Sequence, residues 1–262
     1  MNKQSIFNHF AAIIDNMLEN SLFFETFLQS PCYIDDIVGS IDNAAVPENI
    51  SIRFGASRGC IIDNDYDYVV KFDIEGDSLD DSLCQREMDI YSRAKARNLS
   101  NYFAEPIYLG SYTRTIQFYN YEIIERNMDW CDYDPKDFDE EFIKNEDSFG
   151  DICPITIYIP LYAYPRAEVY QYTMFSDKDS EHYKNEARSI NSPLKKRHLQ
   201  IAMEFVFRYG MEEYERLSDF LDDFHVNDLH YGNVGKIGNV FSLIDYAGWH
   251  TDYSDEYSTG SY

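Results

Sequence analysis

The chain carries little positive charge. Of its 262 residues, 22 are Lys or Arg and 47 are Asp or Glu, which gives a formal net charge of −25. Proteins bind nucleic acid largely through Lys and Arg side chains that displace counterions from phosphates. Anionic membrane surfaces attract the same side chains. The shortage of basic residues therefore argues against both a nucleic-acid-binding protein and a protein docked on an anionic membrane.

Cysteine is also sparse. The chain contains no C-x-x-C pair and an odd number of cysteines, five, far apart in sequence: Cys32, Cys60, Cys84, Cys131 and Cys153. This pattern argues against a zinc knuckle and against a disulfide framework, and it favours reduced, mostly buried thiols. Long apolar runs are missing too. Residues 1–20 show an apolar stripe but neither the continuous apolar core nor the cleavage site of a signal peptide. We therefore expect a cytoplasmic protein without a membrane span.

Aromatic residues, by contrast, are abundant. Tyr and Phe number 23 and 18, and hydrophobic residues make up 44% of the chain. A chain of this length can bury a substantial core, either as one two-lobed domain or as two small ones. No internal repeat is present in the sequence.

Residues 224–249 concentrate the polar groups that suggest chemistry. Asp228 and Asn233 lie in a glycine-containing loop, and an apolar run, residues 240–244, leads from a turn to Asp245 and a further glycine. Two carboxylates and an amide in this order can hold a divalent cation beside a reacting group. Magnesium suits such oxygen ligands, since it binds through one or two carboxylates plus substrate phosphates.

The same segment resembles a known superfamily. D-L-x-x-x-x-N followed by an apolar strand and I-D-x-x-G is similar to the catalytic and metal loops of the protein-kinase-like phosphotransferases. The variant D-L-H-x-G-N is especially similar to the prokaryotic, phage-type and small-molecule branches. The resemblance implies an α+β, two-lobed fold, with an antiparallel β-sheet N-lobe that includes one long helix and with a mostly helical C-lobe.

The resemblance also implies roles for individual residues. Asp228 would orient or deprotonate the acceptor hydroxyl, and Asn233 and Asp245 would hold Mg²⁺. Lys71, on the apolar strand 68–72, would bind the α- and β-phosphates of ATP. Glu87, on a predicted helix over 82–98, would hold that lysine by an ion pair. The alternative is that Lys71 and Glu87 are ordinary surface charges.

The remaining nucleotide contacts are expected in the predicted N-lobe, residues 50–128. Strands at 50–54 and 60–62 flank a glycine turn whose Gly55, Ser57 and Gly59 would lie over the phosphates. Two further strands, 104–110 and 115–126, would complete a five-stranded sheet. A hinge at residues 124–128, including Glu125, would pair with adenine.

The other segments are assigned more simply. Residues 1–49 are predicted to form a helical extension, with one or two helices in 4–29. Residues 129–249 would form the C-lobe, with an acidic stretch at 129–151 that is a solvated face or a mobile insert. We expect residues 176–193 to be looped or a short exposed helix. A helix over 199–221 would bend near Gly210, and the tail 250–262 would be disordered.

Several features depart from the superfamily pattern. Val226 stands where the family has a histidine before the catalytic aspartate, and Asn227 stands where protein kinases have an arginine. No A-P-E motif follows Asp245, so a reduced C-lobe is expected. His225 and His230 could suggest a metal pair, but a histidine in such a loop more often hydrogen-bonds the backbone and braces it, which is the interpretation we adopt for both.

Three functions are compatible with these residues. The first is an ATP- and Mg²⁺-dependent phosphotransferase acting on a hydroxyl of a protein (Ser, Thr or Tyr) or of a small molecule. The second is a non-catalytic pseudokinase, or an acidic decoy that binds a basic protein partner, which the net charge favours. The third is a transferase that moves AMP instead of phosphate.

Overall fold

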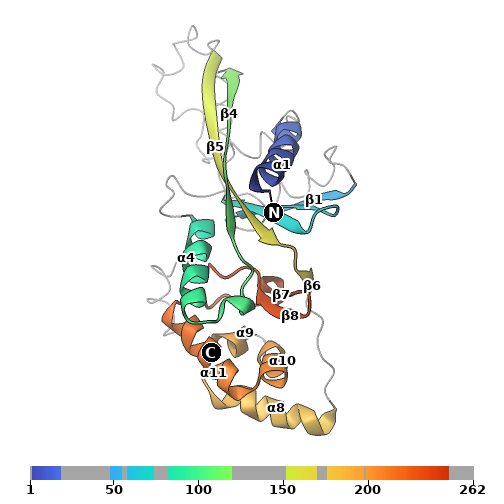
Figure 1. The fold of residues 1–262 in the computed structure, drawn as a ribbon, viewed down its shortest axis with the longest axis vertical. Coiled ribbons are helices and arrows are strands. Elements are labelled where there is room, and N and C mark those ends of the chain that lie inside the picture. The colour runs from blue at the N-terminus through green and yellow to red at the C-terminus, as the bar shows by residue number, and fades with distance from the viewer. Residues whose placement is uncertain are drawn as a thin grey trace, which may run out of the picture. The chain divides into compact units, whose positions relative to one another are not determined.

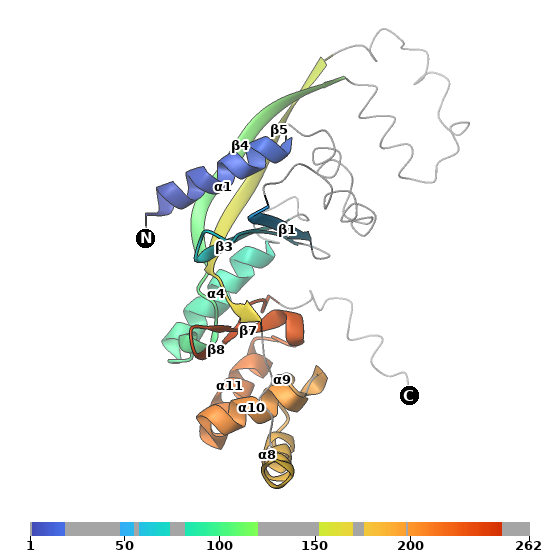
Figure 2. The ribbon, with the colours of Figure 1, turned by 90° about the vertical axis from the view of Figure 1, so that its right-hand side faces the viewer.

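In the computed structural model, the larger β-sheet begins with three strands. Their buried apolar residues alternate along the strand or follow one another. The structure describes residues 2–18, 48–54, 58–73, 82–119, 152–169, 176–197 and 199–247. The sheet contains five strands in the order β1-β2-β3-β5-β4 and is antiparallel. Its strands are β1 (Ile50–Phe54), β2 (Arg58–Asp63), β3 (Tyr68–Asp73), β4 (Ile107–Tyr119) and β5 (Ile152–Pro165). Figures 1 and 2 show β4 and β5 running side by side.

This sheet confirms part of the predicted topology and corrects the rest. The strands predicted at 50–54, 60–62 and 68–72 are present. The prediction of two strands at 104–110 and 115–126 is wrong, because β4 runs without interruption from Ile107 to Tyr119. Gly110, the last residue of the first predicted strand, takes a φ of +138° within β4, so it distorts the strand without ending it. The fifth strand is β5, which lies within the segment 129–249 that is predicted to form the C-lobe.

The chain divides into two compact units. The first comprises residues 1–77 and 108–163, and the second comprises residues 78–107 and 164–262. The helix α1 (Lys3–Leu18) belongs to the first unit, and it confirms the first part of the helix predicted within 4–29. None of the helices in the described part of the chain is long and apolar enough to cross a membrane.

Helix α1 packs on the sheet of the first unit through an apolar face and a polar one. Its buried residues recur at steps of three and four: Ile6, Phe10, Ile13 and Ile14. Near its end, Asp15 accepts hydrogen bonds from the Tyr112 hydroxyl (2.7 Å) and from Nη1 of Arg114 (2.8 Å), both on β4. Burial and the bond to Asp15 raise the pKa of Tyr112 to about 12. The helix is thus an integral part of this unit.

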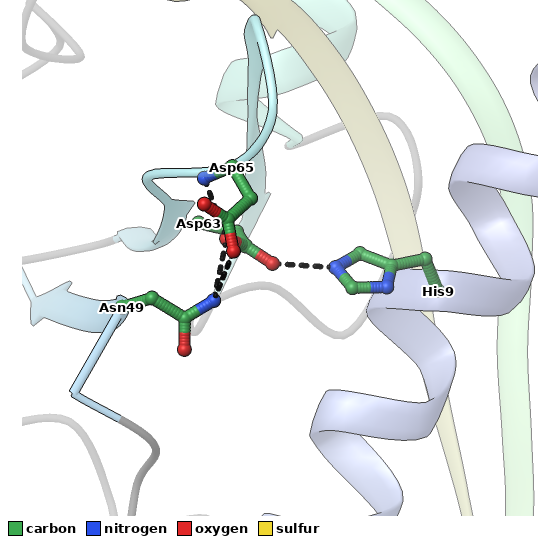
Figure 3. A network of polar contacts seen from close by, with 4 residues as sticks. All are labelled: His9, Asn49, Asp63 and Asp65. Carbon is green, nitrogen blue, oxygen red and sulfur yellow. Dashed lines mark hydrogen bonds and ion pairs between the residues drawn. The ribbon is translucent and has the colours of Figure 1, made fainter.

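A second polar contact fastens α1 at the end of β2 (Figure 3). Oδ2 of Asp63, a residue only 2% exposed, lies 2.7 Å from Nε2 of His9, whose ring also stacks on Tyr66. The other oxygen accepts from the Asn49 amide (3.0 Å) and from the Asp65 N–H (2.9 Å). Burial alone would raise the pKa of the Asp63 carboxyl, but these donors together hold it below its ordinary value of 3.8.

The lowered pKa of Asp63 predicts an acid-dependent loss of stability. A carboxyl whose folded pKa lies below its unfolded one stabilises the fold above the unfolded value, and this contribution fades as pH falls through the folded pKa. Asp63→Asn should therefore be less stable than wild type at neutral pH, and the difference should shrink below pH 3.8. Urea melts between pH 2 and pH 7 measure this. Asp67→Asn, the same change at an exposed position, is the control, and a pH-independent difference for Asp63→Asn would refute the prediction.

The second unit combines helices with a small sheet of order β6-β7-β8. Its helices are α4 (Leu83–Ala96), α8 (Asp177–Ser189), α9 (Pro193–Arg197), α10 (Leu199–Tyr209) and α11 (Met211–Asp223), with two short 3₁₀ turns, η3 (Ser100–Tyr102) and η4 (Tyr231–Asn233). Its strands are β6 (Glu168–Val169), β7 (Val234–Ile237) and β8 (Val240–Leu243). Figure 1 shows α8 to α11 grouped together.

Aromatic residues build the core of this unit. The Phe205 ring on α10 meets Tyr102 and Phe241 edge-on, with ring centroids 5.0 and 5.1 Å apart. The same cluster includes Ile90 and Ala94 of α4, so this helix packs with the helices of the second unit. Burying such large rings is a main source of stability in a core of this kind.

One helical prediction is confirmed in one of its two alternatives, and another is wrong. Residues 176–193 contain a helix and not only a loop, because α8 spans 13 residues after its N-cap Ser176, whose Oγ accepts a hydrogen bond from the Asp179 N–H. The helix predicted over 199–221 is two helices. Gly210 separates α10 from α11 with φ 84° and ψ 171°, a conformation that is essentially restricted to glycine and interrupts the helix completely.

Candidate functional site

Helix α11 directly precedes the predicted catalytic loop, and its C-terminus is capped by backbone hydrogen bonds. His225 takes a left-handed φ of +53°, its N–H donates to the Asp222 carbonyl (3.1 Å), and the Val226 N–H donates to the Leu221 carbonyl (2.8 Å). This pair of bonds is a Schellman motif, in which an apolar contact usually joins the two residues that flank the turn. Leu221 and Val226 are both fully buried. The backbone entering the Asp228 loop is therefore fixed by the core, and His225 serves as the left-handed residue.

The loop itself is organised around Asn233. Nδ2 of Asn233 donates to the Asp228 carbonyl (2.6 Å), and the Asn233 N–H donates to the His230 carbonyl (2.9 Å). Asn233 is 9% exposed, whereas Asp228 is half-buried. The side-chain amide of Asn233 thus links the two ends of the loop by binding the backbone of Asp228.

Asp245 joins this loop through the hairpin of β7 and β8. Ile237 pairs with Val240, which leaves Gly238 and Asn239 as a two-residue turn. Gly238 has a φ of +61° and Asn239 has no positive φ, the combination expected of a type II′ hairpin turn. The returning strand places the Ile244 N–H 2.9 Å and the Asp245 N–H 3.4 Å from the Asn233 carbonyl oxygen. The two residues predicted to hold a metal are therefore adjacent.

Glu87 contacts the residue that follows Asp245. It lies in the middle of α4, is 0% exposed, and its Oε1 accepts a hydrogen bond from the Tyr246 N–H (2.8 Å). The Tyr246 hydroxyl in turn donates to the Ala104 carbonyl (2.8 Å). A buried carboxylate therefore fixes the backbone next to the predicted metal ligand, which a solvated surface charge would not do.

Tyr164 completes the surroundings of Glu87. The phenol is buried, and burial together with the nearby negative charge of Glu87 raises its pKa well above the usual value. The sequence did not indicate a role for Tyr164 or Tyr246. For Tyr246, the only available signal was its position immediately after Asp245. Its contact with Glu87 could not be inferred, because the two residues are 159 positions apart.

The side chains of Asn233 and Asp245 suit a magnesium ion. Because Nδ2 of Asn233 is engaged with the Asp228 carbonyl, the oxygen of the same amide is the atom left to act as a ligand. Asp245 is half-buried and supplies a carboxylate. A cation held by these two groups would take its remaining ligands from water and phosphate, as magnesium does. Within the described ranges, no group of three or more His, Cys, Asp and Glu side chains could hold a metal.

Lys71 and Gly59 lie in the first unit, whereas Glu87, Asp228, Asn233 and Asp245 lie in the second. Lys71 is 9% exposed on β3, so the alternative that it is a surface charge is wrong. Gly59 on β2 faces Phe72, because a Cβ built there would lie 2.3 Å from Cζ of that ring. This packing explains the glycine without reference to phosphate.

The remaining predicted nucleotide contacts, Gly55, Ser57, Glu125 and the hinge at 124–128, lie outside the described residues, as do the acidic stretch 129–151 and the tail 250–262. The role of Gly59 at a phosphate and the ion pair between Lys71 and Glu87 stay predictions. The interpretation of His230 as a brace is confirmed, since its Nδ1 accepts a hydrogen bond from the Gly232 N–H (3.0 Å).

Comparison with protein-family models, with curated proteins and with solved structures found no match for this chain.

Proposed function

We propose that the protein is an ATP- and Mg²⁺-dependent phosphotransferase with a protein-kinase-like, two-lobed arrangement, and that its acceptor is a hydroxyl of a protein or a small molecule. The observation that carries the proposal is the set of hydrogen bonds around Asn233. They bring the backbones of Asp228, Asn233 and Asp245 together, although these residues span 18 positions of the chain. The proposed roles of these residues require this convergence.

Burial adds support. Lys71 and Glu87 are largely withdrawn from water, at 9% and 0% exposure. Charged side chains of these types are almost never fully buried unless they are paired. Desolvation costs stability, and it is tolerated most often where a charge has a specific task. A phosphate-binding lysine and a carboxylate that fixes the metal loop are tasks of that kind.

In this proposal the side chains act mainly by positioning and by compensating charge. Phosphoryl transfer needs the attacking and leaving oxygens in line and the charge on the transferring group neutralised. Bound Mg²⁺ would supply part of that neutralisation. Asp228 would accept the proton of the acceptor hydroxyl, Lys71 would bind the phosphates, and Asn233 and Asp245 would hold the cation. Glu87 would keep Asp245 in place through the Tyr246 N–H.

A non-catalytic acidic protein that binds a basic partner is the second candidate, and the solvent face of α11 favours it. Four exposed acidic residues follow one another at steps of three, four and three: Glu212, Glu215, Asp219 and Asp222. Within the described part of the chain, their side chains make no hydrogen bond or ion pair. Like charges at this spacing destabilise a helix by about 0.2–0.5 kcal/mol per pair, so a binding role would account for them.

Isotope transfer separates the candidates. The protein is incubated with Mg²⁺ and with ATP labelled at either the γ- or the α-phosphate, together with panels of protein and small-molecule acceptors. Label from the γ-position alone supports the proposal. Label from the α-position indicates AMP transfer, which adds about 329 Da to a hydroxyl instead of about 80 Da. Absence of label from both positions across the panels would contradict catalysis and favour the acidic partner protein.

A further inference from the structure

Building on the proposed function, we infer that His230 is a positioning residue of the metal loop. Its imidazole, acting through Nδ1, sets the turn that presents Asn233 to Asp245. The residue occupies the third position of the D-L-H-Y-G-N segment, between the proposed base and the proposed metal ligand. Its function in this account is geometric, and it need not touch the substrate.

His230 holds the loop at two consecutive positions. Its ring Nδ1 accepts from the Gly232 N–H at 3.0 Å, and its backbone carbonyl accepts from the Asn233 N–H at 2.9 Å. The backbone bond closes η4, the short 3₁₀ turn, and the His230 side chain caps this turn through the N–H of its second residue, Gly232. The cap adds a hydrogen bond to a turn that, at three residues, has few internal ones.

The effect of this turn extends to Asp245. The residue fixed by η4 is Asn233, and its own carbonyl accepts the N–H groups of Ile244 and Asp245. Its amide closes on the Asp228 carbonyl. A change in the position of the 3₁₀ turn therefore moves every backbone group that brings the three site residues together. His230 is the side chain that caps this turn, and the hydrogen bonds of Asn233 depend on the turn.

The packing around Gly232 supports the same assignment. A Cβ at position 232 would lie 2.9 Å from Cε1 and 3.1 Å from Nδ1 of His230. A Cβ at this position would require the imidazole to shift, so the glycine allows the ring to lie directly against the backbone. Gly232→Ala would push the ring off its hydrogen bond, although the substitution removes no polar group.

The bond also fixes the form of the imidazole. A ring nitrogen that accepts a hydrogen bond carries no proton, so the neutral ring has its proton on Nε2. The geometry equals that of an Asx-turn, in which an Asn or Asp side-chain oxygen accepts from the N–H two residues later. Asn at position 230 should therefore replace His, whereas Ala should not.

The experiment compares full-length wild type with His230→Asn, His230→Ala, Gly232→Ala and the double variant His230→Ala/Gly232→Ala. Nitrogen NMR of the wild-type ring reports which nitrogen is protonated. Amide hydrogen exchange at positions 232, 233, 244 and 245 reports the order of the loop, and neither readout needs a ligand. Binding of ATP with and without Mg²⁺ is measured in parallel.

We expect the Nε2–H form in wild type and exchange about tenfold faster at these four amides in His230→Ala, with near wild-type rates in His230→Asn. The Mg²⁺-dependent part of ATP affinity should fall by about the same factor and be restored by Asn. Gly232→Ala should resemble His230→Ala, and the double variant should be no worse than either single one, because both remove one contact.

The inference is overturned if the proton is on Nδ1, if His230→Ala leaves exchange unchanged, or if Asn fails to rescue it. If exchange responds as expected while wild type binds no Mg²⁺·ATP, the positioning role stands and the phosphotransferase proposal fails. The two ideas are thus tested separately.

Discussion

Replacing Asp228 by alanine is expected to reduce γ-phosphate transfer by about 10²–10⁴-fold, the usual contribution of a positioned general base. The loop should keep its shape, because the bond from Asn233 ends on the backbone carbonyl of residue 228 and not on its side chain. Binding of Mg²⁺·ATP should therefore persist, since neither proposed metal ligand is changed. The labelled-ATP assay and a binding titration measure the two effects.

Asp222→Ala is the matched control for this experiment. It removes a carboxylate from the exposed face of α11, six residues before Asp228, and it should leave transfer unchanged. If Asp228→Ala transferred phosphate at the wild-type rate, the assignment of Asp228 would be wrong. If both variants lost transfer equally, the loss would reflect the overall charge and not a base.

Glu87→Ala is expected to cause the largest loss of stability. The substitution removes the acceptor of the Tyr246 N–H and leaves a cavity where a residue with 0% exposure stood. A buried N–H without an acceptor costs about 1–3 kcal/mol, and the cavity adds to it, so a total of about 2–4 kcal/mol is expected. For a chain of this size that corresponds to a melting temperature lower by roughly 5–15 °C.

Glu87→Gln separates the hydrogen bond from the charge. Glutamine keeps an oxygen that can accept from the Tyr246 N–H and nearly fills the same volume, so it should remain within about 1 kcal/mol of wild type. Thermal melts of the three proteins without ligand test this. Equal damage in both variants would show that the negative charge stabilises this part of the fold, and an undamaged Glu87→Ala would remove the role assigned to the bond.

Local patterns carried most of what could be read from the sequence. The turn predicted before the apolar run 240–244 is present as Gly238–Asn239 of the β7–β8 hairpin, because turn formation depends on a few adjacent residues. The face of α4 that buries Glu87 and Ile90 followed from helical periodicity. These features depend on neighbours in sequence, and the structure agrees with them.

Features that depend on distant residues were missed. The place of β5 in the sheet could not be read from the sequence, because residues 120–151 separate it from β4. The contact of Glu87 with Tyr246 joins residues 159 positions apart. A glycine within a periodic pattern is often tolerated, so the pattern around Gly210 predicts only a bend, and its backbone angles reveal a complete break.

The most direct test of the central claim is a thermal melt with ATP, with and without Mg²⁺, on wild type, Asp245→Asn and the surface control Asp219→Asn. At a ligand concentration about a hundred times Kd, binding stabilises a protein by about 2.7 kcal/mol, which here is roughly 5–10 °C. The account predicts a shift that requires Mg²⁺, persists in Asp219→Asn and disappears in Asp245→Asn. No shift in wild type, or an equal shift in Asp245→Asn, would contradict a magnesium-nucleotide site at Asn233 and Asp245.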